Sequence, residues 1–241
     1  MDEMLTKILG FRWQRETLDF KSFPKADNLN HAIFKVKKLL SQFVWDITVL
    51  EDNPFTYVEV KTLLEGVTVG GHTVSDEQQV LNQAESWKKL LELVQNDQFH
   101  LTQEVFCLLN AIVAHKESLE WGVFRKTAVT IAGTNYKPAV ADQLSKIFNQ
   151  GILALQQLDP AVENTAIEKA MAFFLFGSLH QFFYDGNKRT ARLMMNGELL
   201  IRGYHAISIP AQKKLEFNEK MIRFYNTQEG TEMMNFLLNC V

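Results

Sequence analysis

Glycine and proline are scarce in this chain, and their scarcity favours long, uninterrupted helices. The 241 residues include 12 glycines and 5 prolines, about 7% of the chain against roughly 12% in average proteins. Between these breaks, apolar residues recur at helical spacing, for example over residues 25–45 and from Ser75 onward. The sequence therefore predicts a mainly helical protein, and 46% hydrophobic residues are enough to build one sizeable core.

One segment departs from the helical pattern. After Gly122, residues 123–138 alternate in the manner of extended chain, with Val129 and Ile131 on one side. Residues 133–135 (Gly-Thr-Asn) supply a plausible turn. We therefore expect an all-α fold that carries one small β-hairpin.

Composition and charge exclude several classes of protein. The net charge of −3 and the pI near 6.1 argue against a general nucleic-acid-binding surface. The longest strictly apolar run, residues 170–176, is much shorter than the ~20 residues of a membrane-spanning helix. The N-terminal residues show no secretory signal pattern, and Cys107 and Cys240 cannot form a disulfide framework. We expect a cytoplasmic protein with neither nucleic acid nor membrane as its partner.

The residues that indicate chemistry gather in segment 180–192, His-Gln-Phe-Phe-Tyr-Asp-Gly-Asn-Lys-Arg-Thr-Ala-Arg. Asp185 and Gly186 make a turn, and the backbone N–H groups that follow lie at the positive end of a new helix, which attracts anions. Three basic residues follow: Lys188, Arg189 and Arg192. Phosphate is the natural ligand, and a carboxylate at the same place suits a bridging Mg²⁺. The alternative is a capped helix whose charges are merely solvated.

The stretch Phe183-x-Asp185-Gly186-Asn187-Lys188-Arg189-x-x-Arg192 resembles the signature of the Fic-domain family, H-x-F-x-[D/E]-G-N-[G/K]-R-x-x-R. Two further regions fit. Phe124-Arg125-x-x-x-Val129-x-Ile131-x-Gly133, followed by Pro138, resembles the family's flap hairpin, which holds a target segment by strand-type pairing. Thr62-x-x-Glu65-Gly66 resembles the inhibitory helix, [S/T]-x-x-x-E-[G/N], although Lys61 stands where that pattern has Ser or Thr.

The resemblance covers roughly residues 50–225 and implies a domain organisation. We expect an N-terminal helical region over 1–50 and a Fic-like domain over 51–225, with the inhibitory-helix-like segment at 54–66. Residues 226–241 are expected to form a C-terminal helix packed on the same domain.

The resemblance also implies transfer of AMP from ATP to a Ser, Thr or Tyr hydroxyl of a target protein, with Mg²⁺ as cofactor. Asp185 would hold Mg²⁺, and the flap residues Val129 and Ile131 would dock the target. The nucleotide would be bound by Gly186, Asn187, Lys188, Arg189 and Arg192. Arg189 would bind the distal phosphates, and Glu65 would inhibit by pairing with Arg192, which otherwise reaches the γ-phosphate.

The catalytic base is where this chain departs from the family pattern. The family histidine lies four residues before the acidic residue, whereas His180 lies five before Asp185 and Gln181 occupies the fourth position. Histidine can accept a proton at neutral pH, and glutamine cannot. Either His180 swings into the site as the base, or Gln181 fills the slot and the protein is a nucleotide-binding regulator with poor transfer. The resemblance also admits removal of AMP or transfer of another phosphate-linked group.

Overall fold

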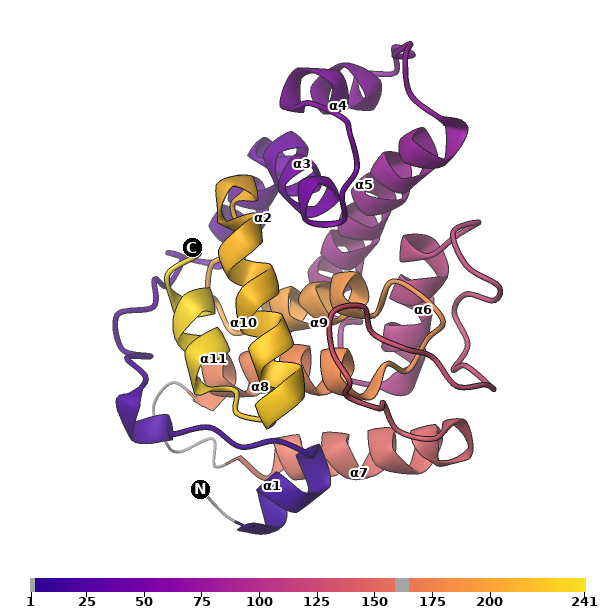
Figure 1. Ribbon diagram of the computed structural model, residues 1–241. Coiled ribbons are helices and arrows are strands. Elements are labelled where there is room, and N and C mark those ends of the chain that lie inside the picture. Colours follow the sequence, from indigo (N-terminus) through magenta and orange to yellow (C-terminus); the bar gives the residue numbers. More distant parts are fainter. Residues whose placement is uncertain (1–2, 159–164) are drawn as a thin grey trace.

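The computed structural model describes residues 3–158 and 165–241, and these residues are mainly helical (Figure 1). Three short 3-10 helices lie at Arg15–Thr17, Ala141–Gln143 and Ala211–Lys213. The α-helices are α1 (Glu3–Leu9), α2 (Leu29–Lys38), α3 (Leu40–Leu50), α4 (Tyr57–Leu64), α5 (Val74–Gln95), α6 (Gln103–Val113), α7 (Leu144–Gln156), α8 (Thr165–His180), α9 (Asn187–Ile201), α10 (Lys214–Thr227) and α11 (Thr231–Leu238). No helix in the described ranges is long and apolar enough to cross a membrane.

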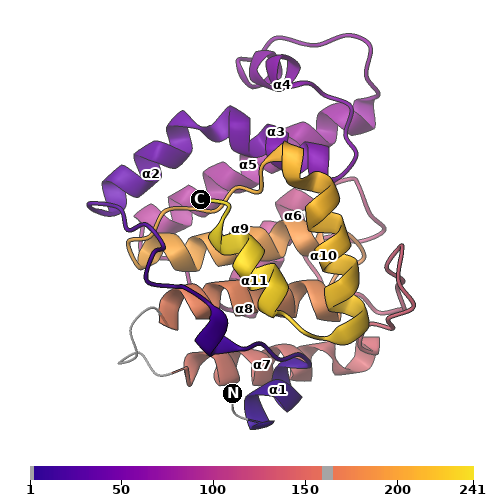
Figure 2. The same ribbon diagram turned by 60° about the vertical axis from the view of Figure 1, so that its left-hand side comes forward.

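Helices α8 and α9 form the centre of the molecule and pack against each other (Figures 1 and 2). Helix α8 is apolar on almost every face from Ala170 to Leu179, and these residues are buried. A helix of this kind must be covered on all sides. Helices α5 and α6 pack on α9, and α7 and α11 pack on α8. The predicted all-α architecture is confirmed.

An aromatic cluster lies beneath the loop between α8 and α9. Phe182 and Phe183 are both fully buried. The ring of Phe182 contacts those of Phe106, Phe124 and Phe148, and the ring of Phe183 contacts those of Phe106 and Phe124. Aromatic rings in such tilted and edge-on arrangements add stability beyond the area they bury. The packing of these rings therefore anchors the loop that leads into α9.

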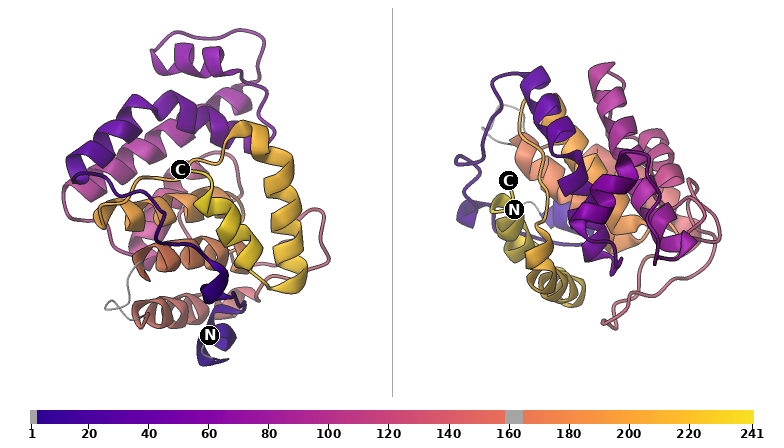
Figure 3. Two further views of the ribbon diagram at one scale, coloured as in Figure 1. Left: turned by 90° about the vertical axis from the view of Figure 1, so that its left-hand side faces the viewer. Right: turned by 90° about the horizontal axis from the view of Figure 1, so that it is seen from above.

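The N-terminal half differs in detail from the sequence-based expectation. The helix expected over 25–45 is two helices, α2 and α3, which meet at Leu39. Segment 54–66 contains α4, which begins after Thr56, and Thr56 and Glu59 form a reciprocal capping box. Helix α4 packs on α3 and α5 and lies at the outer end of the molecule (Figure 3).

The predicted β-hairpin is not formed. In the described part of the chain, segment 123–138 contains no paired strand, and the isolated bridges lie elsewhere, between Arg12 and Glu229 and between Lys25 and Tyr204. A two-stranded hairpin is marginally stable by itself. Here the segment is held in another way, because the buried side chain of Arg125 bonds to backbone carbonyls at both of its ends. We call residues 123–138 the flap.

Candidate functional site

The loop that enters α9 requires glycine at position 186. Gly186 has φ +73°, in the left-handed region, and a Cβ built on it would lie 2.9 Å from Val113 Cγ1 and 3.2 Å from Asn110 Nδ2. The buried Asn110 amide donates to the Asp185 carbonyl (3.0 Å) and to Thr190 Oγ1 (3.2 Å). Helix α6 therefore packs tightly against the turn that begins α9.

We expect Gly186→Ala to destabilise the fold more than a matched glycine substitution. At Gly203, φ is +76° and nothing lies within 4 Å of a built Cβ. Gly203→Ala should therefore cost only the left-handed penalty of about 1 to 2 kcal/mol, whereas Gly186→Ala should add about 1 to 3 kcal/mol of overpacking. Urea unfolding of both variants measures the difference. Equal losses would show that α6 does not press on the turn.

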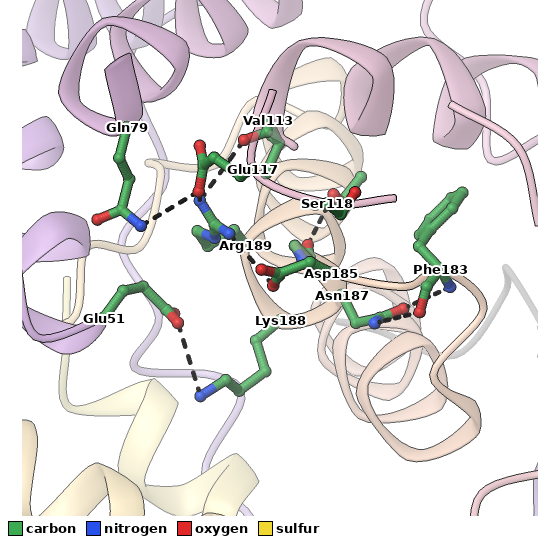
Figure 4. Close-up of polar contacts among 12 residues, drawn as sticks. Glu51, Gln79, Val113, Glu117, Ser118, Phe183, Asp185, Asn187, Lys188 and Arg189 are labelled. Carbon is green, nitrogen blue, oxygen red and sulfur yellow. Dashed lines mark hydrogen bonds and ion pairs between the residues drawn. The ribbon is translucent and has the colours of Figure 1, made fainter. Parts of the chain in front are cut away.

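Two buried arginines follow on α9, and both are partly paired with carboxylates. Arg189 is 2% exposed, and its guanidinium lies 2.7 Å from Glu117 Oε2 and 3.3 Å from Asp185 Oδ1 (Figure 4). Arg192 is 4% exposed and donates to Glu51 Oε1 at 3.0 Å. The positive end of α9 and two buried guanidinium groups therefore meet in one place.

Some of the guanidinium N–H donors of Arg189 and Arg192 lack a hydrogen-bond acceptor among the described residues. Among the described residues, no acceptor lies within hydrogen-bonding distance of Arg189 Nε, Arg192 Nε or Arg192 Nη1, although all three atoms are buried. A buried donor without an acceptor costs about 1 to 3 kcal/mol, and more when it is charged. Such a set of unused cationic donors at a helix N-terminus is suited to an anionic ligand with several oxygens, such as a polyphosphate.

Glu51 occupies part of this cationic site. Its carboxylate lies 3.0 Å from Arg192 Nη2 and 3.9 Å from Lys188 Nζ (Figure 4 shows Glu51 facing Lys188). Burial by itself would raise the pKa of Glu51, but Lys188, Arg192 and Arg189 together hold that pKa below its ordinary value. Glu51 is therefore an anion that the protein itself supplies to the site.

Asp185 fits a magnesium ion that shares its ligands with phosphate. Its side chain is 52% exposed at the start of α9, and one oxygen faces Arg189. The described residues contain no group of three or more His, Cys, Asp or Glu side chains that could hold a metal ion by themselves. Mg²⁺ commonly binds through one carboxylate together with phosphate and water oxygens, so a metal would enter here with its nucleotide.

Gln181 faces the site, and His180 does not. The Gln181 Oε1 accepts a hydrogen bond from Asn187 Nδ2 (3.0 Å), and its Nε2 donates to the Ser178 carbonyl (2.7 Å). Asn187 is also bonded to both the N–H and the carbonyl of Phe183. Residue 181 is therefore tied directly to the first residue of α9.

Of the two alternatives for the catalytic base, the structure adopts the arrangement in which His180 stays outside the site. Its ring is buried, and Nε2 donates to the Leu9 carbonyl at 2.9 Å. Burial lowers the pKa of His180 to about 4, so the ring is neutral. Successive residues of a helix are turned by ~100°, and since α8 stays helical to its last residue, His180 faces α1 rather than Asn187.

Glu65 also lies elsewhere than predicted. It is the exposed residue at the C-terminal end of α4, and the carboxylate that contacts Arg192 is Glu51, at the end of α3. The predicted pairing of Glu65 with Arg192 is therefore corrected. The reason is the placement of α4, which packs on the outer side of α3 and α5, whereas Glu51, the residue that follows α3, contacts Arg192.

The flap contacts α10, which lies beside the site. The flap residues Val129 and Ile131 are partly buried within an irregular loop, and no strand of the described residues aligns them as a docking edge. Tyr136 stacks on Tyr225 of α10 with ring centroids 6.2 Å apart. The flap is thus near the predicted place, in a different conformation from the one expected.

Comparison with known proteins agrees with this geometry. Residues 100–199 match the model of the Fic/DOC family. This segment is similar to a Fic domain. The chain is 23% identical to "Protein adenylyltransferase Fic" of Aedes aegypti over 93% of its length, and 26% identical to the Drosophila grimshawi protein of the same name over 88%. It spans less than half the length of these two curated relatives, 47% and 43% respectively.

Solved structures show that the Fic fold extends over the whole chain. Fic-1 from C. elegans matches with a TM-score of 0.71 at 16% sequence identity, covering 99% of this chain and 68% of that one. A Fic-domain-containing signalling protein from Bacteroides thetaiotaomicron matches with a TM-score of 0.72 at 18% identity, covering 99% of this chain and 91% of that one. Helices outside residues 100–199, including α3 with Glu51, therefore belong to the same fold as the Fic domain.

Sequence reasoning missed three residues that shape the site: Glu51, Asn110 and Glu117. Asn110 had a detectable signal, because an amide within an otherwise apolar helix face must find partners when it is buried. Glu117 accepts from Arg189, Gln79 and Asn82, so it ties the Fic motif to α5. Neither Glu51 nor Glu117 stands in a motif, and only the packing of distant segments brings them to α9.

Proposed function

We propose that this chain binds ATP with Mg²⁺ at the start of α9 and transfers AMP to a hydroxyl group of a target protein. The observation that carries this proposal is the set of buried, unpartnered guanidinium donors on Arg189 and Arg192 beside the positive end of α9. The names of the relatives support the reaction class, since the Fic proteins of Aedes aegypti and Drosophila grimshawi are called protein adenylyltransferases.

Each residue of the loop has a part in this proposal. The N–H groups that follow Gly186 would bind the phosphates at the helix end, and Arg189 and Arg192 would neutralise the charge of the departing pyrophosphate. Asp185 would hold Mg²⁺, which when bound shields the phosphate charges. Phosphoryl-type transfer depends mainly on positioning and charge stabilisation, and this loop supplies both through atoms that are already buried and oriented.

Proton removal is the step for which the site is poorly equipped. Gln181 occupies the place next to Asn187, and an amide cannot accept a proton from a hydroxyl at neutral pH. This observation favours a second candidate function, a nucleotide-binding regulator that transfers AMP very slowly or not at all. The two candidates share the nucleotide site and differ only in the rate of transfer.

Incubation with ATP labelled on the α-phosphate separates them. Label that becomes covalently attached to this protein or to a second protein supports the transferase. Saturable ATP binding without covalent label supports the regulator. Absence of both binding and label would contradict the nucleotide site itself.

We further propose that Glu51 restrains nucleotide binding by occupying Arg192 and Lys188. Replacing Glu51 with glutamine removes the negative charge, so the phosphates no longer compete with it. We expect Glu51→Gln to tighten ATP by about fivefold or more, at the lower end of typical coupling between sites. Calorimetry measures the change, and a double-mutant cycle with Arg192→Ala should show an interaction term.

Glu65→Gln is the matched control, since this carboxylate is exposed at the end of α4. Its affinity for ATP should equal that of the wild type. A gain of affinity in Glu65→Gln, without one in Glu51→Gln, would instead restore Glu65 to the inhibitory role.

A further inference from the structure

Arg125 is a buried cation that is held by backbone carbonyls alone. It is 2% exposed, and among the described residues its guanidinium pairs with no carboxylate. Its donors reach four carbonyl oxygens: Nε to Gln181 (2.5 Å), Nη1 to Thr127 (2.8 Å), and Nη2 to Ala139 (2.5 Å) and His180 (3.4 Å). Burial lowers the pKa of Arg125, yet guanidinium keeps its charge in proteins. Burying a charged side chain costs free energy, so we expect Arg125 to have a role that offsets this cost.

Two of these acceptors belong to the end of α8. The last carbonyls of a helix lack partners within it and carry its negative end, so a cation there is favourable. The backbone N–H of Arg125 also donates to the Phe182 carbonyl at 2.9 Å. Arg125 thus holds three successive carbonyls, 180 to 182, at the point where Gln181 adopts φ +49°. A left-handed conformation at a residue other than glycine needs such support.

The other two acceptors lie at the two ends of the flap. Thr127 is near its beginning, and Ala139 follows its last residue. Because the flap has no strand pairing, the Arg125 guanidinium is the direct link between these ends. The Tyr184 hydroxyl adds a second connection, since it accepts from the Lys126 N–H (3.2 Å). The Arg125 side chain therefore joins both ends of the flap to the backbone of residue 181.

We propose that Arg125 is a positioning residue that sets the flap and the side chain at position 181 in one fixed geometry. The proposal rests on the proposed function, because the position of residue 181 matters for transfer only where a target hydroxyl reaches that residue. The planar fork of arginine can reach carbonyls in several directions at once. Lysine, with a single nitrogen, can satisfy only part of this set.

Hydrogen–deuterium exchange of the protein without nucleotide tests the proposal independently of activity. In Arg125→Gln, the hydrogen-bonded amides of the two regions, Lys126 and Tyr136 in the flap and Phe183 after α8, should exchange at least tenfold faster than in the wild type. Lys126→Gln is the control, since Lys126 is exposed and pairs with Glu120 at the surface, so both regions should keep their exchange rates. Added ethylguanidinium should restore protection in Arg125→Ala, and Arg125→Lys should restore it only in part.

A catalytic readout separates positioning from general stability. In a Gln181→His background that labels protein, Arg125→Lys should lower kcat while KM for ATP stays unchanged, because the phosphate-binding residues do not touch Arg125. Unchanged exchange in either region, or faster exchange throughout α8 and α9, would overturn the proposal. If Arg125→Gln does not fold, the same comparison is made with Arg125→Lys. A wild-type protein that binds no ATP would remove the proposed function and leave the exchange result to decide the role of Arg125.

Discussion

Replacing Gln181 with histidine is expected to raise transfer of AMP to protein by roughly 10²- to 10⁴-fold, the usual contribution of a general base. The reason is geometric, because residue 181 is the one bonded to Asn187 at the start of α9. A histidine there has an ordinary pKa near 6.5 and can accept the proton of a target hydroxyl. The measurement is the initial rate of covalent labelling from ATP labelled on the α-phosphate.

His180→Gln is the control for this substitution. It keeps a donor for the Leu9 carbonyl, and since the native ring is buried away from the site, labelling should not change. Labelling that disappears in His180→Gln would make His180 the base and contradict the assignment of the slot to residue 181. Equal rates in Gln181→His and the wild type, with ATP still bound, would show that proton removal does not limit transfer.

Loss of the Arg189 guanidinium is expected to weaken ATP binding by tenfold to a hundredfold. A lost charge-assisted hydrogen bond costs about 1.5 to 3 kcal/mol, which corresponds to that range of affinity. Because Arg189→Ala also leaves the Glu117 carboxylate buried without its partner, Arg189→Gln is the better variant. Glutamine can still donate to Glu117, so the fold is kept while the charge is lost.

Arg202→Ala provides the matched control for this second prediction. Arg202 lies just past the far end of α9, its side chain is 55% exposed, and it pairs with Glu198. Calorimetric titration should give Arg202→Ala the wild-type affinity. If Arg189→Gln and Arg202→Ala bind ATP equally well, the phosphates do not lie against Arg189.

The sequence predicted the parts of the molecule that depend on neighbours along the chain. The apolar run from Ala170 identified the buried helix α8, and the turn at Gly186 with its following arginines identified the start of α9. These features are local, because helical spacing, a left-handed turn and a helix N-terminus are each determined by a few consecutive residues. The gapless alignment of Gln181 with the family histidine also follows from spacing alone.

The parts that failed depend on contacts between distant segments. Alternation in residues 123–138 suggested paired strands, but it gave no sign that Arg125 would satisfy the carbonyls in their place. Glu65 matched a motif, yet the carboxylate beside Arg192 comes from Glu51, 141 residues away in the chain. Such a pairing depends on how α3 and α4 pack, and local sequence patterns do not contain that information.

The location of the nucleotide is the central claim, and an NMR titration of the wild-type protein with ATP and Mg²⁺ tests it most directly. We predict saturable shifts at the backbone amides of Gly186 and Asn187 and at the Nε–H groups of Arg189 and Arg192, which have no acceptor among the residues that the structure describes. Addition of EDTA should weaken the apparent affinity. Saturable shifts confined to other parts of the chain, or no shifts at any ATP concentration, would contradict the account.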